Sequence, residues 1–186
     1  MIDFSLQLAN EQILLRPMEP EDFDAISKLT QDPAMWYYFT SDLSNIAILK
    51  NWIDAAVEER KDQKRLAFTI IEKSSGKIIG STSLGNYSER DKRIEIGWTW
   101  LGKEFQGIGY NFQAKHLLLE YCFKSLKLER VESKTDIMNE AAKNSLAKSG
   151  FTEEGILRSH TLMTNNRRRD TVYISVLREE YLNNYR

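Results

Sequence analysis

Apolar residues recur at a helical spacing in the first third of the chain. Segment 20–32 carries an apolar residue at every third position, and segment 44–63 has a similar apolar stripe, so we predict two helices. Pro20 suits the first turn of the earlier helix, and Ser44 is the predicted N-cap of the later one. A short strand over 12–16 precedes both helices.

The spacing then changes to the alternation typical of strands. Within 93–101, Ile94, Ile96, Trp98 and Trp100 share one face. Strands are predicted over 66–72, 78–87, 93–101, 129–136, 151–158 and 171–178, and helices over 107–125 and 139–149.

The resulting order is β-α-α-β-β-β-α-β-α-β-β, with the last two strands joined across Asn165-Asn166-Arg167. It predicts an α/β fold in which a mixed central sheet of about seven strands is flanked by about four helices. The length predicts a single domain over residues 1–186.

Composition narrows the classes of function. Apolar residues make up 41% and charged residues 28%, as in ordinary globular proteins. The net charge of -1 argues against nucleic acid or an anionic membrane as a partner. The one cysteine, Cys122, lies in an apolar helical stretch and is expected in the core. Since no Cys/His cluster has ligand spacing and no signal-like or membrane-spanning segment is seen, we expect no metal and a cytoplasmic location.

The loop between strand 93–101 and helix 107–125 is the most informative segment. It contains Gly107 and Gly109, which allow positive φ and close approach of a ligand to the backbone. Free N–H groups and the helix dipole make a helix start of this kind a site for a diphosphate. A dinucleotide fingerprint would need a third glycine where Phe112 stands, and no P-loop lysine follows. The alternative is that both glycines only shape the turn.

Four motifs in order resemble the GNAT acetyltransferase superfamily. Gln106, Gly109 and Asn111 are similar to its acetyl-CoA loop, and segment 139–151 is similar to its Asn-x-x-Ser…Gly-Phe helix. Segments 14–17, 155–158 and 169–173 resemble the opening and closing motifs of the ribosomal-protein-type (Rim-type) branch. Asn111 departs from the usual Gly or Ala, Ala142 from Ser, and Leu146 from a tyrosine acid.

The resemblance implies acetyl-CoA as acetyl donor and transfer to a primary amine, of a protein N-terminus or a small molecule, by direct attack. The cofactor would lie between strands 95–101 and 130–135. The residues implied in binding it are Trp98, Thr99, Trp100, Gln106, Gly107, Ile108, Gly109, Tyr110, Asn111 and Asn139. Gly97 would let its strand bulge. Asn139 fits the N-cap of its own helix equally well. A homodimer is a further expectation from this branch.

Acid–base roles are assigned with alternatives. Glu95 is the candidate base, and its alternative is a carboxylate paired with Arg93 or Lys92. Ser145 or Tyr173 could protonate or orient the leaving thiolate, or serve only in packing.

Two further clusters have competing interpretations. Trp36, Tyr37 and Tyr38 are predicted to wall the acceptor pocket, with a core beneath a loop as the alternative. The run Arg167-Arg168-Arg169 is interpreted as a solvated turn, rather than a phosphate or nucleic-acid patch. Two other functions stay open here: a CoA-binding sensor without turnover, and a nucleic-acid-binding accessory domain.

Overall fold

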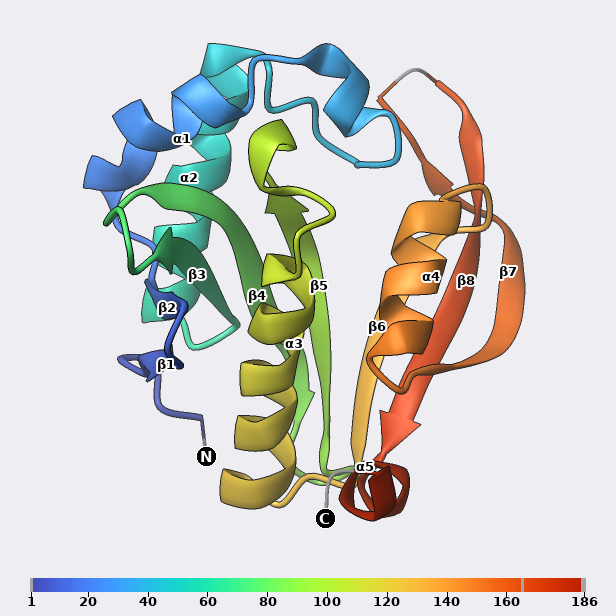
Figure 1. Ribbon diagram of the computed structural model, residues 1–186. Coiled ribbons are helices and arrows are strands. Elements are labelled where there is room, and N and C mark those ends of the chain that lie inside the picture. The colour runs from blue at the N-terminus through green and yellow to red at the C-terminus, as the bar shows by residue number, and fades with distance from the viewer. Residues whose placement is uncertain (1, 165, 185–186) are drawn as a thin grey trace.

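The computed structural model describes residues 2–164 and 166–184. Its strands form one sheet in the order β1-β2-β3-β4-β5-β6-β8-β7 (Figure 1). The strands are β1 (Leu8–Ala9), β2 (Ile13–Pro17), β3 (Arg65–Glu72), β4 (Ile78–Ser88), β5 (Arg93–Leu101), β6 (Arg130–Asp136), β7 (Thr152–Leu162) and β8 (Arg168–Leu177). All neighbours are antiparallel except β5 and β6, which are parallel.

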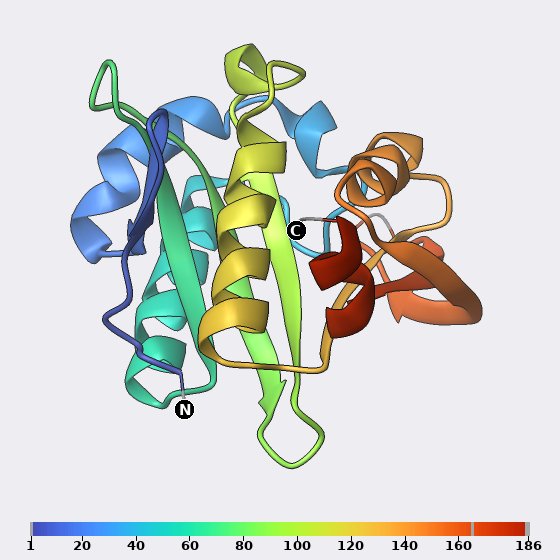
Figure 2. The ribbon, with the colours of Figure 1, turned by 60° about the horizontal axis from the view of Figure 1, so that its bottom comes forward.

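Helices cover both faces of the sheet (Figures 1 and 2). The α-helices are α1 (Phe23–Leu29), α2 (Ile46–Lys61), α3 (Tyr110–Glu120), α4 (Glu140–Lys148) and α5 (Arg178–Asn184). Short 3-10 turns span Pro20–Asp22, Pro33–Trp36 and Lys103–Phe105, and a π-helical turn over Tyr121–Ser125 extends α3.

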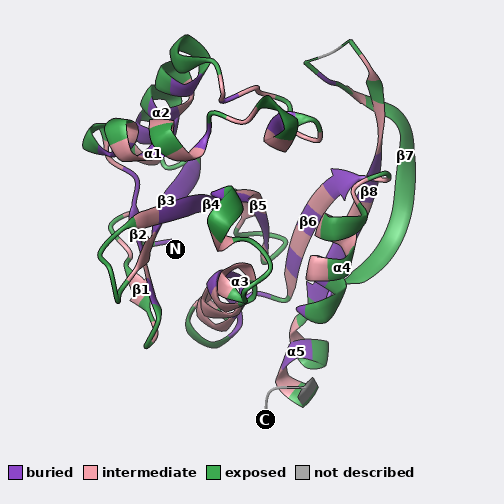
Figure 3. Ribbon diagram, turned by 45° about the horizontal axis from the view of Figure 1, so that its top comes forward, coloured by how far each residue is buried: buried purple, intermediate pink, exposed green. Residues whose placement is uncertain are grey.

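Alternating strand residues feed two separate cores. Leu66 and Phe68 on β3 join the larger core beneath α3 and α4, whereas Ala67 between them joins the core under α1 and α2. Successive side chains of a strand point to opposite faces of the sheet, so a strand buried on both faces contributes to both cores. Figure 3 shows β3 buried in the interior and β7 exposed at the edge.

Helix α3 is the crossover that the parallel β5–β6 pair requires. Gly109 has φ of +101° at the N-cap, so the helix begins at Tyr110. The sequence placed this start at Gly107, which is too early because Gly107 also has a positive φ of +75°.

The α/β architecture is confirmed, with differences of detail. An eighth strand, β1, is only two residues long, and the fifth helix α5 begins where the last strand was expected to end. Both strands of the final hairpin are longer than predicted, and Asn165 in its turn lies outside the described residues. Cys122 is buried in the core as expected.

The predicted N-cap of α2 is wrong by one residue. Asn45 is the cap, because its Oδ1 accepts hydrogen bonds from the N–H groups of Ala47 and Ile48 at 3.0 and 3.2 Å. Ser44 instead donates its hydroxyl to Asp42.

We expect Asn45→Ala to lower the free energy of unfolding by about 1 kcal/mol, since two helix N–H groups lose their acceptor. The matched variant Ser44→Ala should cost less than half as much. Chemical denaturation of the two variants measures the difference, and a larger loss in Ser44→Ala would contradict the assignment of the cap.

Candidate active site

Strands β5 and β6 separate after three paired positions. Their register joins Arg93, Ile94 and Glu95 to residues 130–132, and no pairing follows. Strand β6 continues paired with β8 as far as Asp136. The β5 edge beyond Glu95 therefore has no strand partner, and a cavity of about 300 Å³ lies at this opening.

A β-bulge accompanies the separation. Strand β4 advances from Ser81 to Ser83 while β5 runs from Trp100 back to Gly97, so β5 carries one extra residue there. Trp98 takes the positive φ, +53°. Gly97 was expected to let the strand bulge near Trp98, and the bulge lies there. Gly85 of β4 makes room for it, because a Cβ at Gly85 would lie 3.0 Å from the Trp98 ring.

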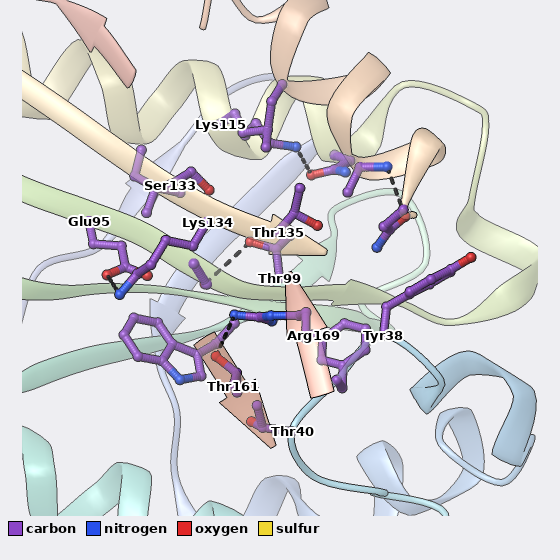
Figure 4. Close-up of a pocket in the computed structure, with 18 of the residues that line it drawn as sticks. Tyr38, Thr40, Glu95, Thr99, Lys115, Ser133, Lys134, Thr135, Thr161 and Arg169 are labelled. Carbon is purple, nitrogen blue, oxygen red and sulfur yellow. Dashed lines mark hydrogen bonds and ion pairs between the residues drawn. The ribbon is translucent and has the colours of Figure 1, made fainter. Parts of the chain in front are cut away.

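The cavity is lined from both faces of the sheet (Figure 4). Asn111 and Lys115 of α3 and Leu146 of α4 line one end. The segment Tyr38–Thr40, together with Arg169 of β8, lines the other. The gap between β5 and β6 thus connects a space under α3 and α4 with a space on the opposite face.

The glycine loop has open space around both of its glycines. Nothing lies within 4 Å of the positions that a Cβ would take at Gly107 and Gly109. The Gln106 amide closes the loop by donating to the Leu101 carbonyl at 2.9 Å. Ile108 is 61% exposed at the tip, and the Tyr110 phenol is anchored on Glu72. The first N–H groups of α3 are therefore open to a negatively charged ligand.

Lys115 is a buried amine at the cavity wall that the sequence did not single out. Its Nζ lies 2.6 Å from Asn111 Oδ1 and 3.0 Å from Ser145 Oγ. Burial lowers the pKa of Lys115 to about 7, because desolvation disfavours the ammonium form. The amine can therefore exchange a proton near neutral pH.

Glu95 lies at the last paired position of β5 and is buried. Its Oε2 accepts from Asn86 Nδ2 at 2.7 Å and pairs with Lys134 Nζ at 2.8 Å. Its Oε1 has no hydrogen-bond partner among the described residues. The alternative pairing with Arg93 or Lys92 is wrong: Arg93 pairs with Glu132, and Lys92 with Glu129.

Of the other polar residues that the sequence analysis named, one lines the cavity and two contact residues that line it. Ser145 does not line it but contacts Asn111 and Lys115, which do. Asn139 lines it and also caps α4, by accepting from the Ala142 N–H at 3.1 Å. Tyr173 packs on the opposite face, between the His160 ring and the Lys134 ammonium.

Of the three neighbouring β5 residues predicted to bind the cofactor, two line the cavity and one does not. Trp98 and Thr99 line the cavity, and the Thr99 hydroxyl lies 2.8 Å from that of Thr82. The Trp100 side chain is buried in the core under α1 and α2, and Trp100 does not line the cavity.

Of the three aromatic residues predicted to wall the acceptor pocket, Tyr38 lines the cavity, together with Phe39. Trp36 does not: it is buried against Trp100 and donates its Nε1–H to the Thr30 carbonyl. The 3-10 turn that ends at Trp36 points this ring into the core. Tyr37 is exposed beneath the Arg167 guanidinium, 5.0 Å away.

The interpretation of the arginine run as a solvated turn is also wrong. Arg167 pairs with the buried carboxylate of Asp136, and Arg169 faces the cavity. Only Arg168 stays exposed, where it bonds to Ser159. Strand β8 starts earlier than predicted, and the strand alternation then points Arg169 inward.

Residues 12–152 match the family model of the acetyltransferase (GNAT) domain. The chain belongs to the GNAT acetyltransferase family. The sequence motifs predicted two features of this fold: a glycine loop at the start of a helix, and an open strand edge beside it.

Relatives are similar over nearly their full length. The chain is 29% identical, over 92% of itself and 94% of the relative, to YdaF of Bacillus subtilis (strain 168), which is provisionally named a ribosomal N-acetyltransferase. It is 25% identical to spermidine N(1)-acetyltransferase of Escherichia coli (strain K12), over 91% and 88%. The structure of a GCN5-related N-acetyltransferase from Brucella melitensis superposes with a TM-score of 0.87 at 24% identity, covering 96% of this chain and 81% of that one, and supports the fold. Together with the family match, these relatives show that the chain is an acetyl-transferring enzyme.

Two features are absent from residues 2–164 and 166–184. No helix there is both long and apolar enough to cross a membrane. No group of three or more His, Cys, Asp and Glu side chains in that part of the chain could hold a metal ion.

The pKa of Lys115 predicts a pH dependence of stability. The pKa of Lys115 is about 7 in the folded state and near 10.5 in the unfolded state. At pH values between these two, the unfolded state therefore binds more protons than the folded state. Stability from this group therefore rises with pH across that window and is lowest below it. Relative to Lys115→Met, which lacks the amine, the wild type should gain on the order of 1 kcal/mol per pH unit between pH ~7 and ~10.

Urea denaturation of the two proteins at several pH values measures this difference. The other titrating groups are common to both proteins and cancel in the comparison. A difference that stays constant between pH 7 and 10 would show that Lys115 titrates at its ordinary value.

Proposed function

We propose that the enzyme takes the acetyl group from acetyl-CoA and transfers it to a primary amine that attacks the thioester directly. One observation carries the proposal: the unpaired β5 edge, Asn111 in the first turn of α3 and the buried carboxylate of Glu95 all border one cavity. The relatives suggest a protein N-terminal amine or a small amine as acceptor.

The donor side fits acetyl-CoA in two respects. The open N–H groups of residues 107–111 suit the diphosphate, because they combine free donors with the positive end of α3. The β5 edge beyond Glu95 offers backbone donors and acceptors that the amide groups of the pantetheine arm can satisfy, as an added strand would. The thioester supplies the activated acetyl group.

The acceptor amine must lose a proton, since an alkyl ammonium titrates near ~10. Glu95 Oε1 is the atom that we assign to receive it, because Oε2 is occupied by Asn86 and Lys134. A backbone N–H at the Trp98 bulge would stabilise the negative charge that develops on the thioester oxygen.

The leaving thiolate needs a proton at the other end of the cavity. Leu146 stands where many family members have a tyrosine acid. Lys115, held by Asn111 and Ser145, replaces it in this proposal: as an ammonium with a pKa of about 7 it can give a proton to a thiolate of ordinary pKa near ~8.5. Ser145 then positions Lys115, and Tyr173 orients Lys134.

Acetyl-CoA should raise the thermal unfolding midpoint of the wild type with increasing concentration. Ile108→Glu places a negative charge at the exposed tip of the loop, so its midpoint should shift only at roughly tenfold higher acetyl-CoA. Ile108→Gln has the same size without the charge and should behave like the wild type. A wild type that millimolar acetyl-CoA leaves unshifted would contradict the proposal.

Glu95→Gln should lower kcat by about 10²–10⁴-fold, because the carboxylate that receives the amine proton is lost. Its response to acetyl-CoA in the thermal assay should be unchanged. The control is Glu132→Gln, which removes the carboxylate directly opposite on β6, outside the cavity. Free-thiol release with a panel of amines measures both variants, and equal losses would exclude Glu95 as the base. A wild type that binds acetyl-CoA but releases no thiol with any amine would instead indicate a sensor.

A further inference from the structure

Arg169 lies in the cavity without an anionic partner. Its Nε donates to Thr171 Oγ1 at 2.9 Å, and its Nη2 lies 3.4 Å from Thr161 Oγ1. No carboxylate among residues 2–164 and 166–184 forms an ion pair with it. A guanidinium has five N–H donors, so most of its capacity for an anion is unused.

The nearest carboxylates are already engaged. Asp136 is held by Arg167, and Glu95 accepts from both Lys134 and Asn86. The cavity end that contains Arg169 therefore has two cations, Lys134 and Arg169, for one carboxylate. Burial lowers the pKa of Arg169, which reflects the cost of holding this charge away from water.

Arg169 lies on the face of the sheet away from the glycine loop. Val172 and Ile174 of β8 point into the core beneath α3 and α4, so the alternating residues Thr171 and Tyr173 point to the opposite face. Arg169 shares that face, where it contacts Thr171. Figure 4 shows Arg169 beside Thr161. An anion bound there belongs to the acceptor and not to the diphosphate.

We propose that the acceptor amine carries a nearby carboxylate, which Arg169 binds while the amine faces Glu95. The inference rests on the proposed function and narrows its acceptor. It separates this enzyme from its polyamine-acetylating relatives, because a polycation would meet the uncompensated positive charge of Arg169. The carboxylate can belong to a free amino acid or to an acidic side chain beside a peptide N-terminus.

Matched acceptor pairs test the inference. With acetyl-CoA as donor, kcat/KM is compared for L-ornithine against putrescine, L-phenylalanine against phenethylamine, and peptides beginning Ser-Asp against Ser-Asn. We expect the carboxylated member of at least one pair to be preferred; the free-amino-acid and peptide arms distinguish the two sources. Spermidine should be a poor acceptor.

Arg169→Gln should reduce that preference roughly 10- to 100-fold, mainly through KM, since a charge-assisted hydrogen bond is lost. Arg169→Lys should restore part of it. The matched control is Arg168→Gln, which removes the neighbouring exposed arginine and should leave the preference unchanged. Calorimetric titration of the CoA-bound enzyme with the preferred carboxylated acceptor should show the same order of affinities without turnover.

The response to acetyl-CoA distinguishes failure of this inference from failure of the proposed function. If acetyl-CoA stabilises the protein but carboxyl-free amines are preferred, or no carboxylated amine binds or reacts, only the inference is overturned. An unchanged preference in Arg169→Gln also overturns it. If acetyl-CoA itself does not stabilise the protein, the proposed function fails first.

Discussion

The separation of β5 from β6 is the constraint on which the site depends. The two strands are parallel for three positions, and beyond them the extra residue near Trp98 shifts the register of β5 against β4. The Trp98 ring lies against Gly85 and 5.1 Å from the Arg65 guanidinium, so packing holds the bulge in place. Backbone groups left without a partner in a partly buried strand are costly. A ligand that supplies amides in place of a neighbouring strand would recover that cost, which is why we propose the opening as the binding site.

The opening gives the cavity two ends with different chemistry. At the α3–α4 end, Asn111 and Ser145 hold a buried amine, Lys115, across the two helices. An alkyl side chain in its place would avoid the desolvation that lowers the pKa of this lysine. The protein thus retains a destabilising group at the wall of its cavity, as is common where a proton must move.

The sequence predicted the architecture because its strands and helices differ clearly in apolar spacing. The glycine loop was also predictable, since a helix start with two glycines has few uses. Lys115 was not, because nothing local distinguishes it from a surface lysine until α4 packs over it. Arg169 was missed for a related reason: the predicted strand began at Thr171, which left Arg169 in a turn. Trp36 was wrongly assigned to the acceptor pocket. It ends a short 3-10 turn, and so short a segment has no repeating apolar pattern that would show which way the ring points.

In the proposed function, charge is distributed so that the two substrates are recognised independently. The glycine loop offers the diphosphate the backbone dipoles at the start of α3. Lys134 and Arg169 lie instead beyond the strand gap, at the end that we assign to the acceptor. A change of charge at Arg169 can therefore alter which amine is accepted while leaving the donor site intact. The relatives are named for different acceptors, and such a division would let acceptor choice vary without a change at the donor site.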